Sequence, residues 1–188
     1  MAASSRMIAL GTPMPSFALP DTVSGRVVDS VSLAGRPSVV IFLCNHCPYV
    51  KHIRAGLADF GRFCRDQNVP MVAVSANDIS THPDDAPAAM TIEAQQAGYV
   101  FPYLYDGSQA VAKAFDAQCT PDLYIFDVNG KLAYRGQLDD ARPSNPIPVT
   151  SRDARAAVEA LLAGNRPAAE QKASIGCSIK WKPGNEPG

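Results

Sequence analysis

The stretch Ser38-Val39-Val40-Ile41-Phe42-Leu43-Cys44-Asn45-His46-Cys47-Pro48 decides how this chain folds. Residues 38–43 form an unbroken run of mainly β-branched and aliphatic side chains. Such a run is typical of a central parallel strand that is covered on both faces. The run ends at two cysteines separated by two residues. The stretch therefore predicts a buried strand that leads directly into a CxxC motif.

A helical pattern follows Pro48. Apolar residues recur at spacings of three and four, which is the period of one face of a helix: Val50, Ile53, Leu57, Phe60 and Cys64. Residues 69–75 then form a second apolar run, which predicts another buried strand. The two strands and the helix make a βαβ unit with the CxxC motif at its first strand-to-helix junction.

Further elements are expected on both sides of this unit. An extended segment within 11–19 pairs with 26–29 across a turn at Ser24-Gly25. Residues 79–87 are polar and read as a loop. The other predicted elements are helices at 88–97 and 109–115, a hairpin of 122–126 and 131–136 around Asn129-Gly130, and a last helix from Thr150 to about Ala163.

This order of elements predicts an α/β protein with a thioredoxin-like fold. A central mixed sheet is flanked by helices and carries an N-terminal β-hairpin extension and a helical insertion. A doubly wound sheet of another kind is the alternative, although no glycine-rich phosphate loop follows either apolar strand. We expect one domain at 1–164 and an extended C-terminal tail at 165–188, anchored chiefly by Trp181.

Composition narrows the classes of function. The chain has 188 residues, a net charge of -1 and 19% charged residues, without a basic patch for nucleic acid or an anionic membrane. Its longest apolar run is far too short to cross a bilayer, and residues 1–10 lack the apolar region of a signal peptide. We therefore expect a cytoplasmic protein. Five cysteines in a reducing compartment suggest redox or metal chemistry rather than a framework of structural disulfides.

The CxxC motif carries the expected chemistry. The N–H groups and partial positive charge of a helix N-terminus stabilise a thiolate. We expect Cys44 to be the exposed attacking thiol and Cys47 the resolving thiol, with His46 lowering the pKa of Cys44 further. A zinc site is the rival interpretation, but zinc needs about four ligands and a second cysteine pair is missing. Redox chemistry without a cofactor or metal is favoured.

Several motifs resemble a known family. The pattern Gly11-x-Pro13-x-Pro15-x-Phe17-x-Leu19 and the strand leading into CxxCP resemble the redoxin superfamily of alkyl hydroperoxide reductase and thiol-specific antioxidant proteins. The segments 44–51, 119–122 and 176–182 look like its peroxiredoxin-like subgroup with a thioredoxin fold. The resemblance runs from about Leu10 to Lys182. It implies the fold and the thiol chemistry, and leaves the substrate open.

The same resemblance gives a role to Thr120-Pro121. In thioredoxin folds a Thr-Pro pair faces the CxxC motif, and its proline is cis. Such a turn would leave the Thr120 backbone free to pair with an incoming peptide or thiol substrate. A plain trans proline that opens a strand is the alternative.

Departures from better-known relatives bear on the activity. Ser38 stands where thioredoxins carry a buried aspartate, and Leu43 replaces their tryptophan. Peroxiredoxins need a proline and a threonine or serine upstream of the position that corresponds to Cys47, where this chain has Val40 and Cys44. The peroxidase interpretation is weakened, although Arg135 could still supply a positive group nearby.

The other candidate residues are interpreted as follows. Cys64 is expected to be a buried, inert thiol. Cys119 has a packing or a redox role, and Cys177, on a mobile tail, is either a bystander or an additional resolving thiol. His52 and His82 are expected to be solvated and not metal ligands. Asp84-Asp85 and Asp139-Asp140 are expected in polar loops and not as paired catalytic carboxylates.

The sequence therefore predicts an enzyme, a thiol–disulfide oxidoreductase that uses Cys44 and Cys47. The first alternative is a peroxiredoxin-like thiol peroxidase with an antioxidant role. The second is a metal-binding protein that uses Cys44, Cys47 and either His46 or Cys119. Expected partners are a protein or small-molecule thiol or disulfide and a thioredoxin- or glutathione-type electron donor, with no nucleic acid or membrane.

Overall fold

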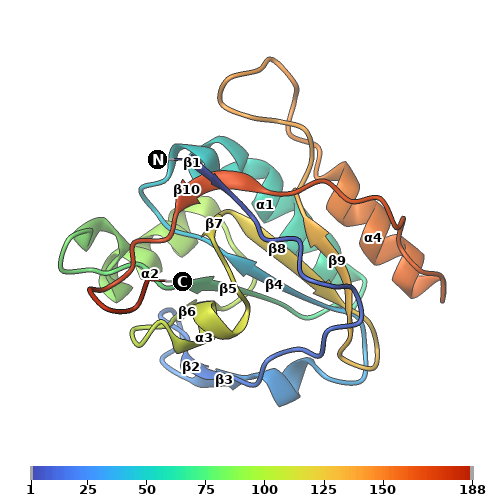
Figure 1. Ribbon diagram of the computed structural model, residues 1–188, viewed down its shortest axis with the longest axis horizontal. Helices are drawn as coiled ribbons and strands as arrows, with labels where there is room; N and C mark the ends of the chain where they lie inside the picture. Colours follow the sequence, from blue (N-terminus) through green and yellow to red (C-terminus); the bar gives the residue numbers. More distant parts are fainter. Residues whose placement is uncertain (1, 187–188) are drawn as a thin grey trace.

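The computed structural model describes residues 2–186. Met1, in the domain expected at 1–164, and residues 187–188, in the tail expected at 165–188, lie outside the described residues. A five-stranded sheet forms the centre of the molecule, in the order β6-β5-β4-β8-β9 (Figure 1). Its strands are β4 (Ser38–Phe42), β5 (Met71–Ser75), β6 (Tyr103–Tyr105), β8 (Asp122–Phe126) and β9 (Leu132–Gly136). β4, β5 and β6 run parallel, and β8 and β9 are antiparallel to their neighbours. The predicted mixed sheet and thioredoxin-like α/β fold are confirmed.

Helices cover one face of this sheet, and a thinner layer covers the other. The helices on the first face are α1 (Pro48–Asp66), α2 (Pro87–Ala97) and α4 (Arg152–Leu162). The second face is covered by the helix α3 (Ala110–Ala114), the 3-10 helix η1 (Ser30–Leu33) and the hairpin of β2 (Ala18–Pro20) and β3 (Val27–Asp29). No helix within residues 2–186 is long and apolar enough to cross a membrane.

The two covered faces explain the unbroken apolar run in β4. Val39 and Ile41 pack in the core on the side of α1, whereas Val40 and Phe42 pack on the side of α3. All four side chains are fully buried. Because successive side chains of a strand point to opposite faces, a strand between two layers needs an apolar residue at every position.

The helix after the CxxC motif matches its predicted pattern. All five residues of the predicted apolar face are buried. α2 ends at Gly98, which adopts the left-handed conformation that favours glycine, and β8 and β9 are joined at Asn129-Gly130 as expected. Ser151, rather than Thr150, is the N-cap of α4.

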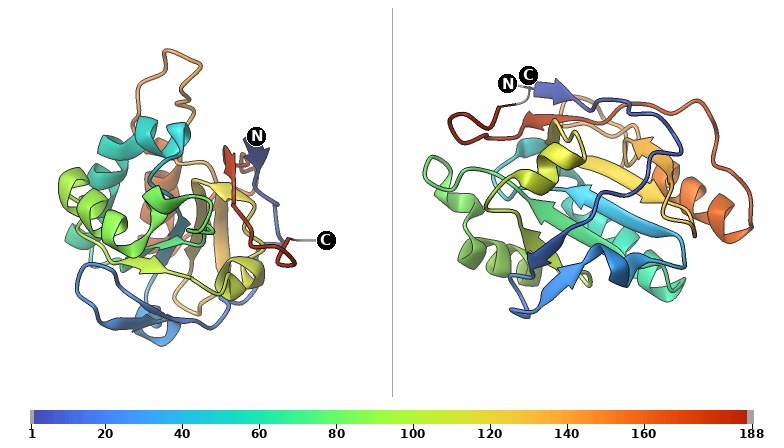
Figure 2. Two further views of the ribbon diagram at one scale, coloured as in Figure 1. Left: turned by 90° about the vertical axis from the view of Figure 1, so that its left-hand side faces the viewer. Right: turned by 60° about the horizontal axis from the view of Figure 1, so that its bottom comes forward.

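A second sheet joins the two ends of the chain. β1 (Ala2–Ser4), β10 (Ile175–Ser178) and β7 (Cys119–Thr120) form a three-stranded antiparallel sheet, and Figure 2 shows the terminal segments side by side. The expectation of a loosely held tail is therefore wrong for residues 175–178. Trp181 packs against the core on the α3 side, as predicted. β10 lacks the alternation of apolar and polar residues that would have indicated a strand.

Gly176 permits the close approach of β10 to β7. A methyl group at this position would collide with the carbonyl oxygen of Thr120. Glycine has no Cβ, so the two backbones can approach closely enough for Cys177 to lie opposite Thr120. The position of β10 therefore depends on this residue.

Asp122 makes the stability of the fold dependent on pH. Burial raises the pKa of its carboxyl group to about 7. The pKa of this group is about 4 in an unfolded chain, so the folded protein binds the proton of Asp122 more tightly than the unfolded chain does. The stability that this proton contributes is complete below about pH 4 and is lost as the pH rises to the folded pKa of about 7. We expect the free energy of unfolding of Asp122→Asn, relative to the parent, to increase by about 4 kcal/mol from about pH 4 to about pH 8.

Urea unfolding of both proteins at several pH values measures this difference. Asp66→Asn is the control, because Asp66 is exposed at the end of α1. Parallel pH profiles for Asp122→Asn and the parent would contradict the prediction.

Candidate active site

The CxxC loop joins β4 to α1, as the sequence predicts. Cys44 lies just after the end of β4, and Cys47 is the N-cap residue of α1. The exposed fractions of these two residues are 1% and 0%. Both sulfur atoms contact the same residue, Thr120, at 3.1 Å and 3.2 Å, and each thiol shifts the pKa of the other, so the pair is close enough to act as one redox unit.

The sulfur of Cys47 is surrounded by hydrogen-bond donors. The Cys44 thiol makes the largest contribution to lowering its pKa, and the Cys177 thiol adds to it. The backbone N–H groups of Val50 and Cys177 also point at this sulfur. Val50 is in the first turn of α1, where N–H groups have no partner inside the helix. These donors offset the cost of burial and hold the pKa of Cys47 well below its usual range.

Cys44 has the opposite environment. Its thiol donates to Cys47, it is buried, and the nearby Asp85 repels a negative charge, so its pKa is raised. The expectation that Cys44 is the exposed thiol with the lowered pKa is therefore wrong. The physical reason is the place where the helix begins: α1 starts at Pro48, so its free N–H groups reach Cys47 and not Cys44.

Thr120 and Pro121 lie against the two cysteines. The peptide bond between them is cis, as predicted. The Thr120 hydroxyl is 3.1 Å from the Cys44 sulfur, and the Thr120 carbonyl lies 3.2 Å from the Cys47 sulfur, which donates to it when protonated. The Thr120 backbone was expected to be free for a substrate. Instead, β10 occupies that edge, with Cys177 opposite Thr120.

His46 is held by a buried carboxyl group that the sequence analysis missed. The Oδ2 atom of Asp85 lies 2.6 Å from Nδ1 of His46. Its Oδ1 atom accepts hydrogen bonds from the backbone N–H groups of Asn45, at 2.7 Å, and His46, at 3.3 Å. Asn77 donates to Oδ2 at 2.8 Å. Asp85 is fully buried, so the expectation of a solvated polar loop is wrong for this residue.

The contacts of Asp85 fix the CxxC loop from outside the βαβ unit. Asp85 ends the 3-10 helix η2 (Pro83–Asp85), and Asn77, which donates to it, accepts a hydrogen bond from the backbone N–H of Lys180. Asn45 in turn accepts a hydrogen bond from the hydroxyl of Tyr103. No local motif marks such a residue, because its partners are distant in sequence.

The site also brings together three groups that are able to bind a metal. One possible ligand atom each from Cys44, His46 and Asp85 lies within 4.8 Å of the others. Metal ligation requires a deprotonated thiol. The raised pKa of Cys44 and the donors that already surround Asp85 therefore favour hydrogen bonding over metal ligation. His82 is half-buried and its ring lies 4.8 Å from that of His46, whereas His52 is exposed, as expected.

The other cysteines lie in different environments. Cys119 is buried in β7, and its thiol donates to the carbonyl of Pro121 at 3.5 Å. Burial raises its pKa. Burial also raises the pKa of Cys64 to about 12, which agrees with the expected inert thiol. Cys177 is half-buried, and burial together with its hydrogen bond to Cys47 raises its pKa.

Arg135 is bound by Gln171. Its backbone N–H and its guanidinium both donate to Oε1 of Gln171, the second at 2.7 Å. Gln171 belongs to the segment that follows α4. The expectation that Arg135 supplies a positive group to the thiols is therefore not met by its contacts.

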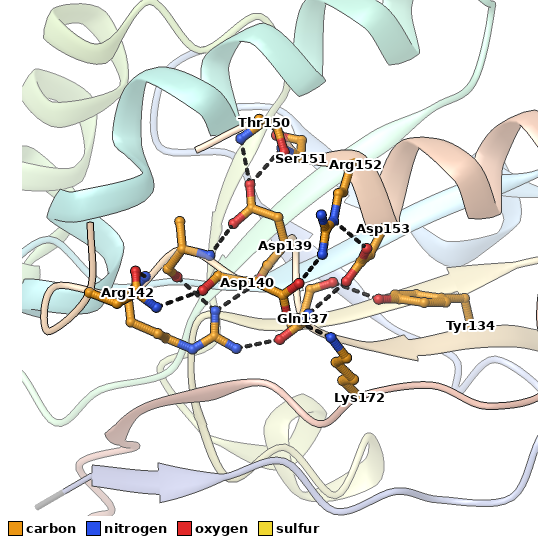
Figure 3. A network of polar contacts seen from close by, with 12 residues as sticks. Tyr134, Gln137, Asp139, Asp140, Arg142, Thr150, Ser151, Arg152, Asp153 and Lys172 are labelled. Atoms are coloured by element: carbon orange, nitrogen blue, oxygen red, sulfur yellow. Dashed lines mark hydrogen bonds and ion pairs between the residues drawn. The ribbon is translucent and has the colours of Figure 1, made fainter. Parts of the chain in front are cut away.

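A polar network shapes the surface beside Pro121. Asp139, expected in a polar loop, is buried and accepts hydrogen bonds from the backbone N–H groups of Thr150 and Ser151, both at 2.6 Å (Figure 3). Arg142 donates to the side chain of Gln137 and to the carbonyl of Asp139. The loop held in this way borders a small cavity. Its lining includes Tyr49, Ile53, Pro121, Arg142 and Ile175.

We expect Cys47 to be the thiolate of the reduced protein near neutral pH. The ultraviolet absorbance of the thiolate, followed during a pH titration, should show an ionisation below neutrality that disappears in Cys47→Ser. Cys44→Ala should keep this ionisation but raise the pKa of Cys47 by about 1, because one hydrogen bond is lost.

The matched control is Cys64→Ala, which removes a distant buried thiol and should leave the titration unchanged. If the ionisation survives in Cys47→Ser and disappears in Cys44→Ala, the order of the two thiols is the one expected from the sequence.

Two solved structures are similar to this chain over almost its whole length. An uncharacterized conserved protein from Geobacillus kaustophilus is 49% identical, with a TM-score of 0.95 and 97% of each chain covered. A hypothetical protein from Sinorhizobium meliloti is 42% identical, with a TM-score of 0.93, covering 96% of this chain and 99% of the other.

A secreted Mycobacterium tuberculosis disulfide oxidoreductase homologous to E. coli DsbE has the same fold. It is 18% identical, with a TM-score of 0.57, covering 79% of this chain and 95% of the other. No curated protein matches the chain. The model of the AhpC/TSA family matches residues 10–135, two thirds of the sequence. The chain therefore belongs to the AhpC/TSA family.

Proposed function

We propose that this protein is a thiol–disulfide oxidoreductase whose redox pair is Cys44 and Cys47. The observation that carries the proposal is the CxxC loop, which holds both sulfur atoms against Thr120 and places Cys47 at the N-terminus of α1. A thiolate beside a protonated thiol is the arrangement that disulfide exchange requires, because one sulfur attacks and the other resolves. The fold neighbours that are disulfide oxidoreductases support the same chemistry.

In the reductive direction, the Cys47 thiolate attacks a substrate disulfide. A bond forms between Cys47 and one substrate sulfur, and the other substrate sulfur leaves as a thiolate. Cys44 then attacks the Cys47 sulfur, its proton passes to the substrate thiolate that left first, and the second substrate thiolate is released. The protein is left with a Cys44–Cys47 disulfide, and the substrate has gained two electrons.

His46 and Asp85 position this pair. Asp85 binds two backbone N–H groups of the CxxC loop and the ring of His46. His46 is 22% exposed, so it lies between the buried carboxyl and the surface. We assign both residues to holding the loop between the cysteines. Thr120 contacts both sulfur atoms, through its hydroxyl and its carbonyl.

The partners in this proposal are thiols and disulfides. A protein or small-molecule disulfide is the substrate, and a thioredoxin- or glutathione-type donor returns the electrons. Both are abundant in a reducing cytoplasm, which is the compartment we propose.

Two variants test the exchange. Cys47→Ser should lower the rate of insulin reduction by about 100-fold or more, because the attacking thiolate is gone. The double variant Cys44→Ser with Cys177→Ser should accumulate a mixed disulfide with oxidised glutathione on Cys47, detectable by mass spectrometry, because neither neighbouring thiol remains to resolve it. Cys64→Ala should keep the parent rate. Parent-like activity in Cys47→Ser would exclude the proposal.

A thiol peroxidase is the second candidate function, and the burial of the cysteines favours it. A small hydroperoxide reaches a fully buried sulfur more easily than a bulky disulfide does. The Cys47 thiolate would attack one peroxide oxygen, the O–O bond would break, and one proton from solvent would balance the charge, which gives a sulfenic acid and an alcohol or water. Cys44 would condense with the sulfenic acid, with loss of water, to give the same disulfide. Peroxide consumption by the reduced protein, without insulin reduction, would select this function.

A further inference from the structure

β10 lies where a thioredoxin-like protein would bind a substrate strand. It pairs in antiparallel fashion with β7, the strand that leads into the cis proline. Strand addition of this kind is a common way to bind an extended peptide. In this protein the bound strand belongs to the same chain, and Cys177 on β10 lies opposite Thr120.

Cys177 also lies beside the reactive sulfur, because it is opposite Thr120, whose carbonyl is 3.2 Å from the Cys47 sulfur. Hydrogen bonding from the thiol and the backbone N–H of Cys177 contributes to the lowered pKa of Cys47. Cys47 therefore has two thiol neighbours, Cys44 on one side and Cys177 on the other. Of these three residues, Cys44 and Cys47 are buried, and only Cys177 is partly exposed.

We propose that Cys177 is a built-in exchange partner of Cys47, which carries the disulfide from the buried Cys44–Cys47 pair to the protein surface. This inference rests on the proposed function and adds the route by which a bulky thiol or disulfide reaches the pair. Its substrate class is a protein dithiol or disulfide.

The transfer is an isomerisation that needs no external oxidant. The Cys177 sulfur attacks the Cys47 sulfur of the Cys44–Cys47 disulfide. The bond between Cys47 and Cys177 forms, the bond between Cys44 and Cys47 breaks, and the proton of Cys177 ends on Cys44. The number of disulfides is unchanged.

A substrate thiol then attacks the sulfur of the partly exposed Cys177, and Cys47 leaves. Cys47 is the better leaving group of the two because its pKa is the lower one. A second thiol of the substrate attacks the mixed disulfide, so the substrate becomes a disulfide and Cys177 is released as a thiol. In the reductive direction the same steps run in reverse.

Disulfide mapping tests the route. The full-length protein is oxidised with increasing doses of diamide, quenched with acid, alkylated and analysed by mass spectrometry. We expect both Cys44–Cys47 and Cys47–Cys177 in the parent, only Cys47–Cys177 in Cys44→Ala, and only Cys44–Cys47 in Cys177→Ala. Cys64→Ala should give the same pairs as the parent.

Turnover gives an independent readout. Cys177→Ala should lower the reduction of insulin by at least about 10-fold, because an intramolecular step is replaced by a hindered bimolecular one. Its reaction with oxidised glutathione, a small disulfide, should change much less. Gly176→Ala keeps all five cysteines but forces β10 away from β7, so it should lose the Cys47–Cys177 disulfide.

The two proposals fail in different ways. If Cys177 stays free at every dose in the parent and in Cys44→Ala, and Cys177→Ala reduces insulin at the parent rate, the relay is excluded while the Cys44–Cys47 exchange stands. If no Cys44–Cys47 disulfide forms and Cys47→Ser is as active as the parent, the proposed function itself is excluded.

Discussion

The contact of β10 with β7 is the constraint on which the site depends. Gly176 allows the two backbones to approach, and this approach brings both the thiol and the N–H of Cys177 to the sulfur of Cys47. A buried thiolate is costly unless donors surround it. Two of the four donors at Cys47 come from β10, so a strand near the C-terminus helps to set the chemistry of a motif more than a hundred residues earlier.

The start of α1 supplies a further N–H donor that lowers the pKa of Cys47. Pro48 has no N–H group, and it occupies the first position of the helix, where none is needed. The free N–H of Val50 therefore serves the sulfur of Cys47. Cys44 lies three residues before Cys47, receives no N–H donor from the helix, and donates the hydrogen bond of its thiol to Cys47. A shift of three residues in the chain thus raises the pKa of one thiol and lowers that of the other.

The carboxyl group of Asp85 holds the CxxC loop by accepting hydrogen bonds from its backbone. The N–H groups of Asn45 and His46, between the end of β4 and the start of α1, donate to Asp85 and not to a strand or a helix. Asp85 also binds the ring of His46, while Asn77 links this carboxyl to the backbone of Lys180. The C-terminal segment is therefore coupled to the CxxC loop in two places, through Cys177 and through Asn77.

The sequence by itself determined the strand, the CxxC motif, the helix after it and the family. These features depend on local periodicity and on neighbouring residues, such as the apolar run at 38–43 and the spacing from Val50 to Cys64. Only the tertiary structure decided that Asp85 is buried against the CxxC loop and that Cys177 lies opposite Thr120, beside Cys47. These contacts join segments that are 39 or more residues apart, and contacts over such separations leave no periodic pattern in the chain.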